Sequence, residues 1–134
     1  MIVLDEQLLG LAIETTLARW YPGRVCFINE LRPDSIVKDE SIAVLLQRAP
    51  QSTFVTINET DFWRQIAVTN AFCIVCAAIP TKRKAEVPIL IRRLLRHPQF
   101  RTKKLRMGKV VRLTAEGAFY YTAEDATVRP VENW

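Results

Sequence analysis

Residues 54–63 read FVTINETDFW and mark the point where an apolar strand ends in a cluster of oxygen-bearing side chains. The β-branched and aromatic beginning of this stretch is typical of a buried strand. Asn58 ends the apolar run, and Glu59 and Asp61 follow within three residues. Because Gly or Pro is enough to end a strand, this choice of residues raises the hypothesis that the strand end carries chemistry.

Strand-like and helix-like segments alternate on both sides of this stretch. Short apolar runs without polar alternation predict strands, and apolar residues at helical spacing predict helices. The predicted strands are 1–4, 24–28, 53–57 and 71–79, and the predicted helices are 8–20, 39–48, 61–67 and 87–95. This order predicts an α/β fold in which a parallel central sheet is covered by helices on both faces.

The C-terminal part predicts a β-hairpin over residues 109–122. VVRLT at 110–114 and AFYYT at 118–122 flank a turn that contains Gly117. The hairpin is rich in apolar side chains, which either pack on their own sheet or complete a homodimer. These side chains are Val110, Leu113, Phe119, Tyr120 and Tyr121.

Length and composition predict a single domain over residues 1–134, with 49% hydrophobic and 25% charged residues as in ordinary globular proteins. No run of about 18 apolar residues exists, so no membrane-spanning helix is expected. Asp5, Glu6 and Glu14 interrupt the apolar N-terminal region, and no basic segment precedes it. We therefore expect a cytoplasmic protein without a signal peptide and without a membrane partner.

The three cysteines, an odd number in apolar surroundings, predict reduced thiols in the core. Cys73 and Cys76 have the C-x-x-C spacing but lie within a predicted strand. Residues three apart on a strand point to opposite faces, which argues against one shared metal site.

Charge is distributed unevenly along the chain. Residues 1–81 contain nine acidic residues and six Lys or Arg, whereas residues 82–112 contain twelve Lys or Arg and one acidic residue. A nuclease needs acidic side chains that bind a cation and, beside them, a basic surface that binds phosphates, and this distribution of charge would suit one. A basic helix is also often only a solvated face, so charge alone leaves both interpretations open.

Acidic residues follow or precede the predicted elements at one edge of the sheet. Asp5 follows the first strand, Asn58 and Asp61 follow the third, and Asp39 opens the second helix. Ligands of open α/β sheets bind beyond the carboxyl ends of the strands, and Mg²⁺ or Mn²⁺ prefers such oxygen ligands. The alternative explanations are a helix cap for Asp39, a cap of the next, short helix for Asp61 (or Thr60 in its place), and an Asx turn for Asn58. Asp5 is harder to explain structurally, because burying an unpartnered acid is costly.

The order of three motifs resembles the PIN-like domain family, which includes the short VapC-related ribonuclease toxins of bacterial toxin–antitoxin pairs. The motifs are IVLDEQLL at 2–9, KDESIAVLLQRA at 38–49 and FVTINETDFW at 54–63. A helix rich in basic residues and a G-K-V-V strand, typical of the later part of the family, look like 87–96 and 108–111. The resemblance covers most of the chain and implies a PIN-like three-layer fold, with 82–112 as a basic helix and loop segment.

The resemblance also implies a function: a Mg²⁺- or Mn²⁺-dependent endoribonuclease, a hydrolase of RNA phosphodiester bonds, restrained by an antitoxin protein. The catalytic and metal-binding acids would be Asp5, Asp39 and Asp61, joined at the metal by Asn58 and more weakly by Glu6 and Glu40. Thr56 would hydrogen-bond a ligand carboxylate, and Trp63 would stack on a base or belong to the core. The RNA backbone would be bound by Arg92, Arg93, Arg96, Lys103 and Lys104.

Asn58 stands where many members of this family carry Asp. An Asn carbonyl binds a cation without adding negative charge, which favours an alternative: a catalytically inactive PIN-like module that binds nucleic acid or protein. Binding of a divalent metal would separate the two hypotheses. A regulatory domain of the receiver type is disfavoured. That fold carries a phosphorylated Asp at the end of its third strand, where this chain has Asn58.

Overall fold

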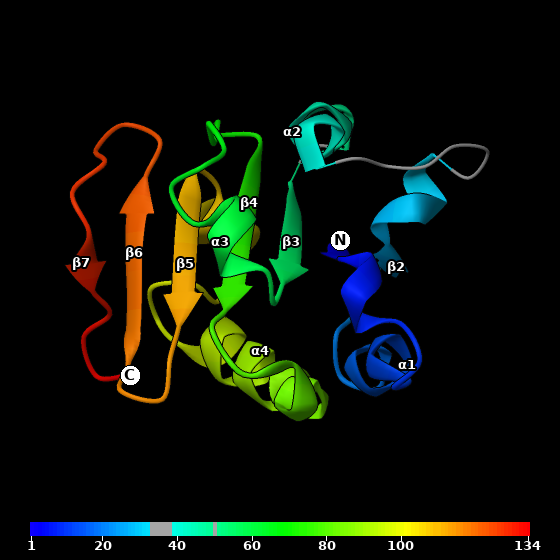
Figure 1. The fold of residues 1–134 in the computed structure, drawn as a ribbon. Helices are drawn as coiled ribbons and strands as arrows, with labels where there is room; N and C mark the ends of the chain where they lie inside the picture. Colours follow the sequence, from blue (N-terminus) through cyan, green and yellow to red (C-terminus); the bar gives the residue numbers. More distant parts are fainter. Residues whose placement is uncertain (33–38, 50) are drawn as a thin grey trace.

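The computed structural model describes residues 1–32, 39–49 and 51–134, and it leaves the side chains of Asp39 and Glu40 outside the description. The described part is an α/β fold built on a seven-stranded mixed sheet (Figure 1). The sheet has the order β2-β1-β3-β4-β5-β6-β7, and its first five strands are parallel. The strands are β1 Ile2–Leu4, β2 Val25–Phe27, β3 Ser52–Thr56, β4 Phe72–Ala77, β5 Lys109–Leu113, β6 Ala118–Thr122 and β7 Arg129–Pro130.

The strand order changes direction between β1 and β3. β1 pairs with β2 on one side and with β3 on the other, and both pairings are parallel. The backbone N–H of Asp5 donates to the carbonyl of Val55 at 2.9 Å, which ties the residue after β1 to β3. Ligands of open α/β sheets bind beyond the carboxyl ends of the strands at such a switch point.

Helices cover both faces of the sheet, as predicted. α1 Ile13–Ala18 and α4 Val87–Arg96 bury Leu17, Ile91 and Leu94 on one face. α2 Asp39–Arg48 and α3 Glu59–Phe62 bury Leu46 and Phe62 on the other face. The remaining turns are the 3₁₀ helices η1 Glu6–Leu8, η2 Ile28–Leu31 and η3 Thr81–Glu86, and the short helix α5 Lys103–Arg106. No helix in the described residues combines the length and the apolarity needed to cross a membrane.

The cysteines of β4 confirm the expected alternation along a buried strand. Cys73 packs on the face covered by α1 and α4, and Cys76 packs on the face covered by α2 and α3. Burial raises the pKa of each of these two thiols to about 12. The two sulfur atoms therefore lie on opposite sides of the sheet, and both are protonated at neutral pH.

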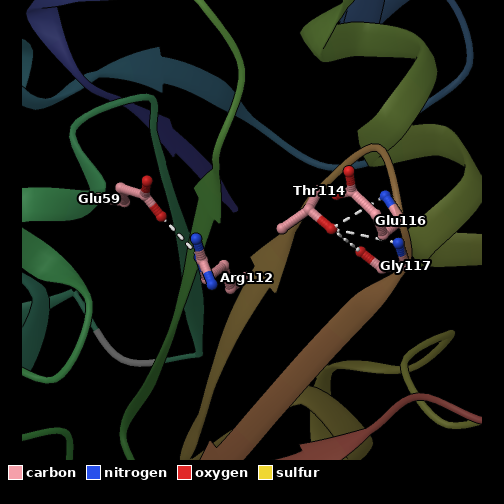
Figure 2. A network of polar contacts seen from close by, with 5 residues as sticks. All are labelled: Glu59, Arg112, Thr114, Glu116 and Gly117. Carbon is pink, nitrogen blue, oxygen red and sulfur yellow. Dashed lines mark hydrogen bonds and ion pairs between the residues drawn. The ribbon is translucent and has the colours of Figure 1, made fainter.

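Strands β5 and β6 form an antiparallel hairpin from Lys109 to Thr122. Its turn is closed by Thr114 Oγ1, which accepts hydrogen bonds from the N–H groups of Glu116 and Gly117 (Figure 2). Three apolar side chains proposed for a dimer surface are buried in the chain's own core, and the other two are half-buried. The buried ones are Val110, Leu113 and Tyr121, and the half-buried ones are Phe119 and Tyr120.

Two predicted helices are shorter than their apolar patterns indicate. The helix expected over 8–20 begins only at Ile13, because Gly10 (φ +92°) and Ala12 (φ +52°) adopt left-handed backbone conformations. The helix expected over 61–67 is α3, which begins at Glu59 and ends before Arg64 at φ +63°. Local backbone breaks therefore override an apolar spacing that continues beyond them.

Candidate functional site

Asp5 lies at the carboxyl end of β1 and is 7% exposed. Thr56, the last residue of β3, donates a hydrogen bond from Oγ1 to Asp5 Oδ2 at 2.6 Å. Burial raises the pKa of Asp5, the Thr56 hydroxyl and the N–H groups of Glu6 and Gln7 lower it, and the charge of Asp61 raises it. The charged form of this carboxylate is therefore supported by neutral hydrogen-bond donors, and a second acid lies close enough to affect it.

Asn58 connects Thr56 to Asp61. The N–H of Asn58 donates to Thr56 Oγ1 at 2.9 Å, and Asn58 Oδ1 accepts from the N–H of Asp61 at 3.2 Å as the N-cap of α3. Asn58 Nδ2 also donates to Asp61 Oδ2 at 2.6 Å. One hydrogen-bonded chain thus runs from buried Asp5 through Thr56 and Asn58 to exposed Asp61. We call these four residues the acidic edge.

The acidic edge brings together four of the residues proposed from the sequence. Its oxygen donors are two carboxylates, one amide and one hydroxyl, which are hard ligands of the kind that Mg²⁺ and Mn²⁺ prefer. Asn58 Oδ1 is engaged by the helix cap, although an amide oxygen has a second lone pair. Asn58, and not Asp61 or Thr60, is therefore the cap of α3, so the cap expected at Asp61 is wrong, and capping does not conflict with a role of Asn58 as a ligand.

The side chains of other acids near these strand ends lie apart from this chain of hydrogen bonds. Glu6 is exposed in η1. Glu59 Oε2 accepts from Arg112 Nε at 2.6 Å, so its charge is balanced by the arginine on β5 (Figure 2). The side chains of Asp39 and Glu40 lie outside the described residues. Within the described part of the chain, no group of three or more His, Cys, Asp or Glu is arranged to hold a metal ion.

The basic residues proposed to bind RNA lie away from the acidic edge. α4 packs on the face of the sheet that α1 also covers, whereas Asn58 and Asp61 belong to α3 on the other face. Arg106, at the end of α5, donates from Nε to Thr53 Oγ1 near the start of β3. The proposed residues are Arg92, Arg93 and Arg96 in the second half of α4, and Lys103 and Lys104 in α5.

A different set of basic residues lies at the carboxyl edge. Lys84 in η3 donates from Nζ to the carbonyl of Gln7 at 3.1 Å, two residues beyond Asp5. Arg112 and Arg83 help line a hollow of about 310 Å³ beside the ends of β4 and β5. The sequence motifs assign these residues no role, although TKRKAE at 81–86 follows the end of β4 after a short connection at 78–80 and therefore begins at this edge.

Trp63 follows α3 and packs against the core. Its ring lies 5.1 Å from the ring of Tyr121 in an edge-to-face arrangement, and the side chain is half-buried. The arrangement agrees with the core interpretation of this aromatic residue.

Comparisons with known proteins were made at three levels. No family model, no curated protein and no solved structure matches this chain. The observations that bear on function are therefore the contacts at the acidic edge and the motifs of the sequence itself.

Proposed function

We propose that the chain is a metal-dependent endoribonuclease of PIN-like type whose centre is the acidic edge. The observation that supports the proposal most strongly is the Asp5–Thr56–Asn58–Asp61 chain at the switch point of the sheet. A buried carboxylate that is coupled to a second carboxylate is costly unless a ligand compensates it. A toxin role, with an antitoxin protein as partner, rests on the resemblance of the motifs.

The donor set of the acidic edge fits a hard divalent cation. Asp5 and Asp61 would hold Mg²⁺ or Mn²⁺, and Asp39 is proposed as the third acid. When bound, such an ion supplies a Lewis acid and lowers the pKa of a bound water. Thr56 would keep Asp5 oriented and ionised through its 2.6 Å hydrogen bond.

Basic side chains at the carboxyl edge would guide the RNA backbone to this centre. Lys84 is held near Asp5 by the carbonyl of Gln7, and Arg112 is held by Glu59 through Nε. Their positive charges would attract phosphate without selecting a base sequence. Lys84 and Arg112 are therefore proposed as phosphate contacts near the reacting bond, in addition to the basic residues of α4 and α5.

A second candidate function is a PIN-like module without catalysis. The hydrogen bond from Asn58 Nδ2 to Asp61 Oδ2 favours it, because the amide already engages one oxygen that a cation would use. In this alternative Asn58 only caps α3, and the basic segments alone bind a partner.

Calorimetric titration with Mn²⁺ and with Mg²⁺ separates the two candidates. The nuclease proposal predicts saturable binding that is abolished by Asp61→Asn and kept by Asp125→Asn, a matched change at an acid that pairs with Arg129. It also predicts tighter binding for Asn58→Asp, which adds the missing negative charge. Absence of binding by the parent protein would favour the inactive module.

A further inference from the structure

The second half of α4 lies between two tryptophans, each with an arginine over its ring. The guanidinium of Arg92 lies 5.8 Å from the ring centroid of Trp20, and that of Arg93 lies 4.4 Å from Trp134. Both arginines are exposed, and both indole rings are half-buried. The two rings are thus anchored in the fold while keeping part of their surface open to solvent.

A hollow lies beside each tryptophan. The first has a volume of about 450 Å³ and is lined by Trp20, Arg101 and Lys103, among others. The second has a volume of about 520 Å³ and is lined by residues that include Arg96 and Trp134. Each hollow therefore combines an aromatic wall with positive charge.

Among the residues that the structure describes, no acidic one lines either hollow, and six of the lining residues are Arg or Lys. The ion pairs formed within the described residues all involve other arginines, namely Arg83, Arg112 and Arg129. The hollow beside Arg112 differs, since it is also lined by Glu59, Glu86 and Glu116. The arginines of α4 thus form no ion pair with the other residues that the structure describes.

We propose that this surface binds single-stranded RNA, with phosphates at the basic side chains and unpaired bases stacked on the two indole rings. We define the α4 surface as Trp20, Arg92, Arg93, Arg96, Arg101 and Trp134. Proteins that bind single strands combine a basic groove with aromatic rings in this way, and arginine adds cation–π contacts. That the nucleic acid is RNA rests on the proposed function. That it is single-stranded rests on the two indole rings, which can stack only on unpaired bases.

The chemistry of the α4 surface favours a nucleic acid over an acidic protein. Ile89, at 72% exposure, is the one strongly exposed apolar side chain among the residues that line the two hollows. A protein-binding face would be expected to present a contiguous apolar patch. Two separated rings among arginines suit stacked bases and phosphates better.

The test measures binding without cleavage, in Asp5→Asn protein with EDTA. Fluorescence anisotropy compares a labelled oligouridylate of roughly 12 nucleotides, a duplex RNA of the same length and poly-glutamate. Trp134→Leu is expected to weaken single-strand binding about tenfold while leaving the salt dependence unchanged. Arg93→Gln is expected to reduce the slope of log K against log salt by about 0.7, and Arg129→Gln serves as the control that changes neither.

Unchanged single-strand affinity in both Trp134→Leu and Arg93→Gln would overturn the proposal. Tighter binding of duplex RNA or of poly-glutamate than of the single strand would overturn it as well. Arg93 is exposed, so its variant remains informative if Trp134→Leu fails to fold. If the parent protein binds single-stranded RNA through the α4 surface but does not cut RNA, only the proposed nuclease function is refuted. If the parent protein cuts RNA and the variants of the α4 surface bind single strands as tightly as it does, only the proposal for the α4 surface is refuted.

Discussion

Removing the Thr56 hydroxyl should destabilise the fold by disrupting the acidic edge. Thr56 is fully buried, and its Oγ1 both donates to Asp5 Oδ2 at 2.6 Å and accepts from the N–H of Asn58 at 2.9 Å. A hydrogen bond to a charged group contributes about 1.5–3 kcal/mol, and a neutral one about 1 kcal/mol. We therefore expect Thr56→Val, which nearly conserves volume, to lower the free energy of unfolding by about 3 kcal/mol at pH 7.

The loss caused by Thr56→Val should depend on pH in a defined direction. Burial raises the pKa of Asp5 from its ordinary value of 3.8, so the folded protein binds this proton more tightly than the unfolded one. As pH rises from the pKa of Asp5 in the unfolded chain to its higher pKa in the folded protein, ionisation of Asp5 lowers the free energy of unfolding. Above the folded pKa, this contribution no longer changes with pH. Because Thr56→Val raises the folded pKa of Asp5 further, the loss should be largest above the folded pKa and smaller by about 1 kcal/mol in acid, where Asp5 carries no charge.

Urea denaturation of a double-mutant cycle measures this prediction. Asp5→Asn keeps an acceptor for Thr56 but removes the charge, so Thr56→Val should cost about 1 kcal/mol less in the Asp5→Asn background than in the parent. The reasoning would be refuted by a loss of less than about 1 kcal/mol at pH 7 for Thr56→Val. An equal loss with and without the charge of Asp5 would refute it as well.

Three further predictions follow from burial and charge. Ile91 is 0% exposed and Ile89 is 72% exposed, so Ile91→Ala should lower the free energy of unfolding by about 3 kcal/mol and Ile89→Ala by less than about 0.5 kcal/mol. Equal losses in chemical denaturation would contradict the orientation of α4. Glu59→Gln should cost less than about 1 kcal/mol, since its ion pair with Arg112 is over one-third exposed, and a thermal shift that implies a much larger loss would be inconsistent with it. The two thiols of β4, with pKa values of about 12, should react with a disulfide reagent at pH 7 only after unfolding, and rapid reaction of native protein would show that the strand opens.

The sheet and its helical cover were predictable because each element has a strong local pattern. The apolar run at 71–79 contains β4, and the helix predicted at 39–48 is α2 with the same bounds. The helix predicted at 8–20 was too long, because its apolar spacing continues across Gly10 and Ala12, whose left-handed backbone cannot be read from hydrophobic periodicity. No strand was predicted beyond residue 122, yet β7 at Arg129–Pro130 extends the sheet through pairing with β6.

The acidic edge was partly predictable from strand ends alone. Asp5 and Asp61 were expected together because parallel strands end at one edge of the sheet. The balancing of Glu59 by Arg112 was not predictable, since it pairs residues 53 apart in the chain. The basic segment was treated as one unit, but its residues separate in space. Lys84 contacts the carbonyl of Gln7, two residues beyond Asp5, whereas Arg106 reaches Thr53 near the start of β3.

Cleavage of a mixed, structured RNA tests the central claim most directly. The purified protein is assayed with Mn²⁺, with Mg²⁺ and with EDTA, beside Asp5→Asn and the control Asp125→Asn. The acidic edge as a nuclease centre predicts cutting that requires the metal, vanishes in Asp5→Asn and persists in Asp125→Asn, while all three proteins unfold cooperatively. Cutting by Asp5→Asn at the rate of the parent, or no cutting by the parent with either metal, would contradict it.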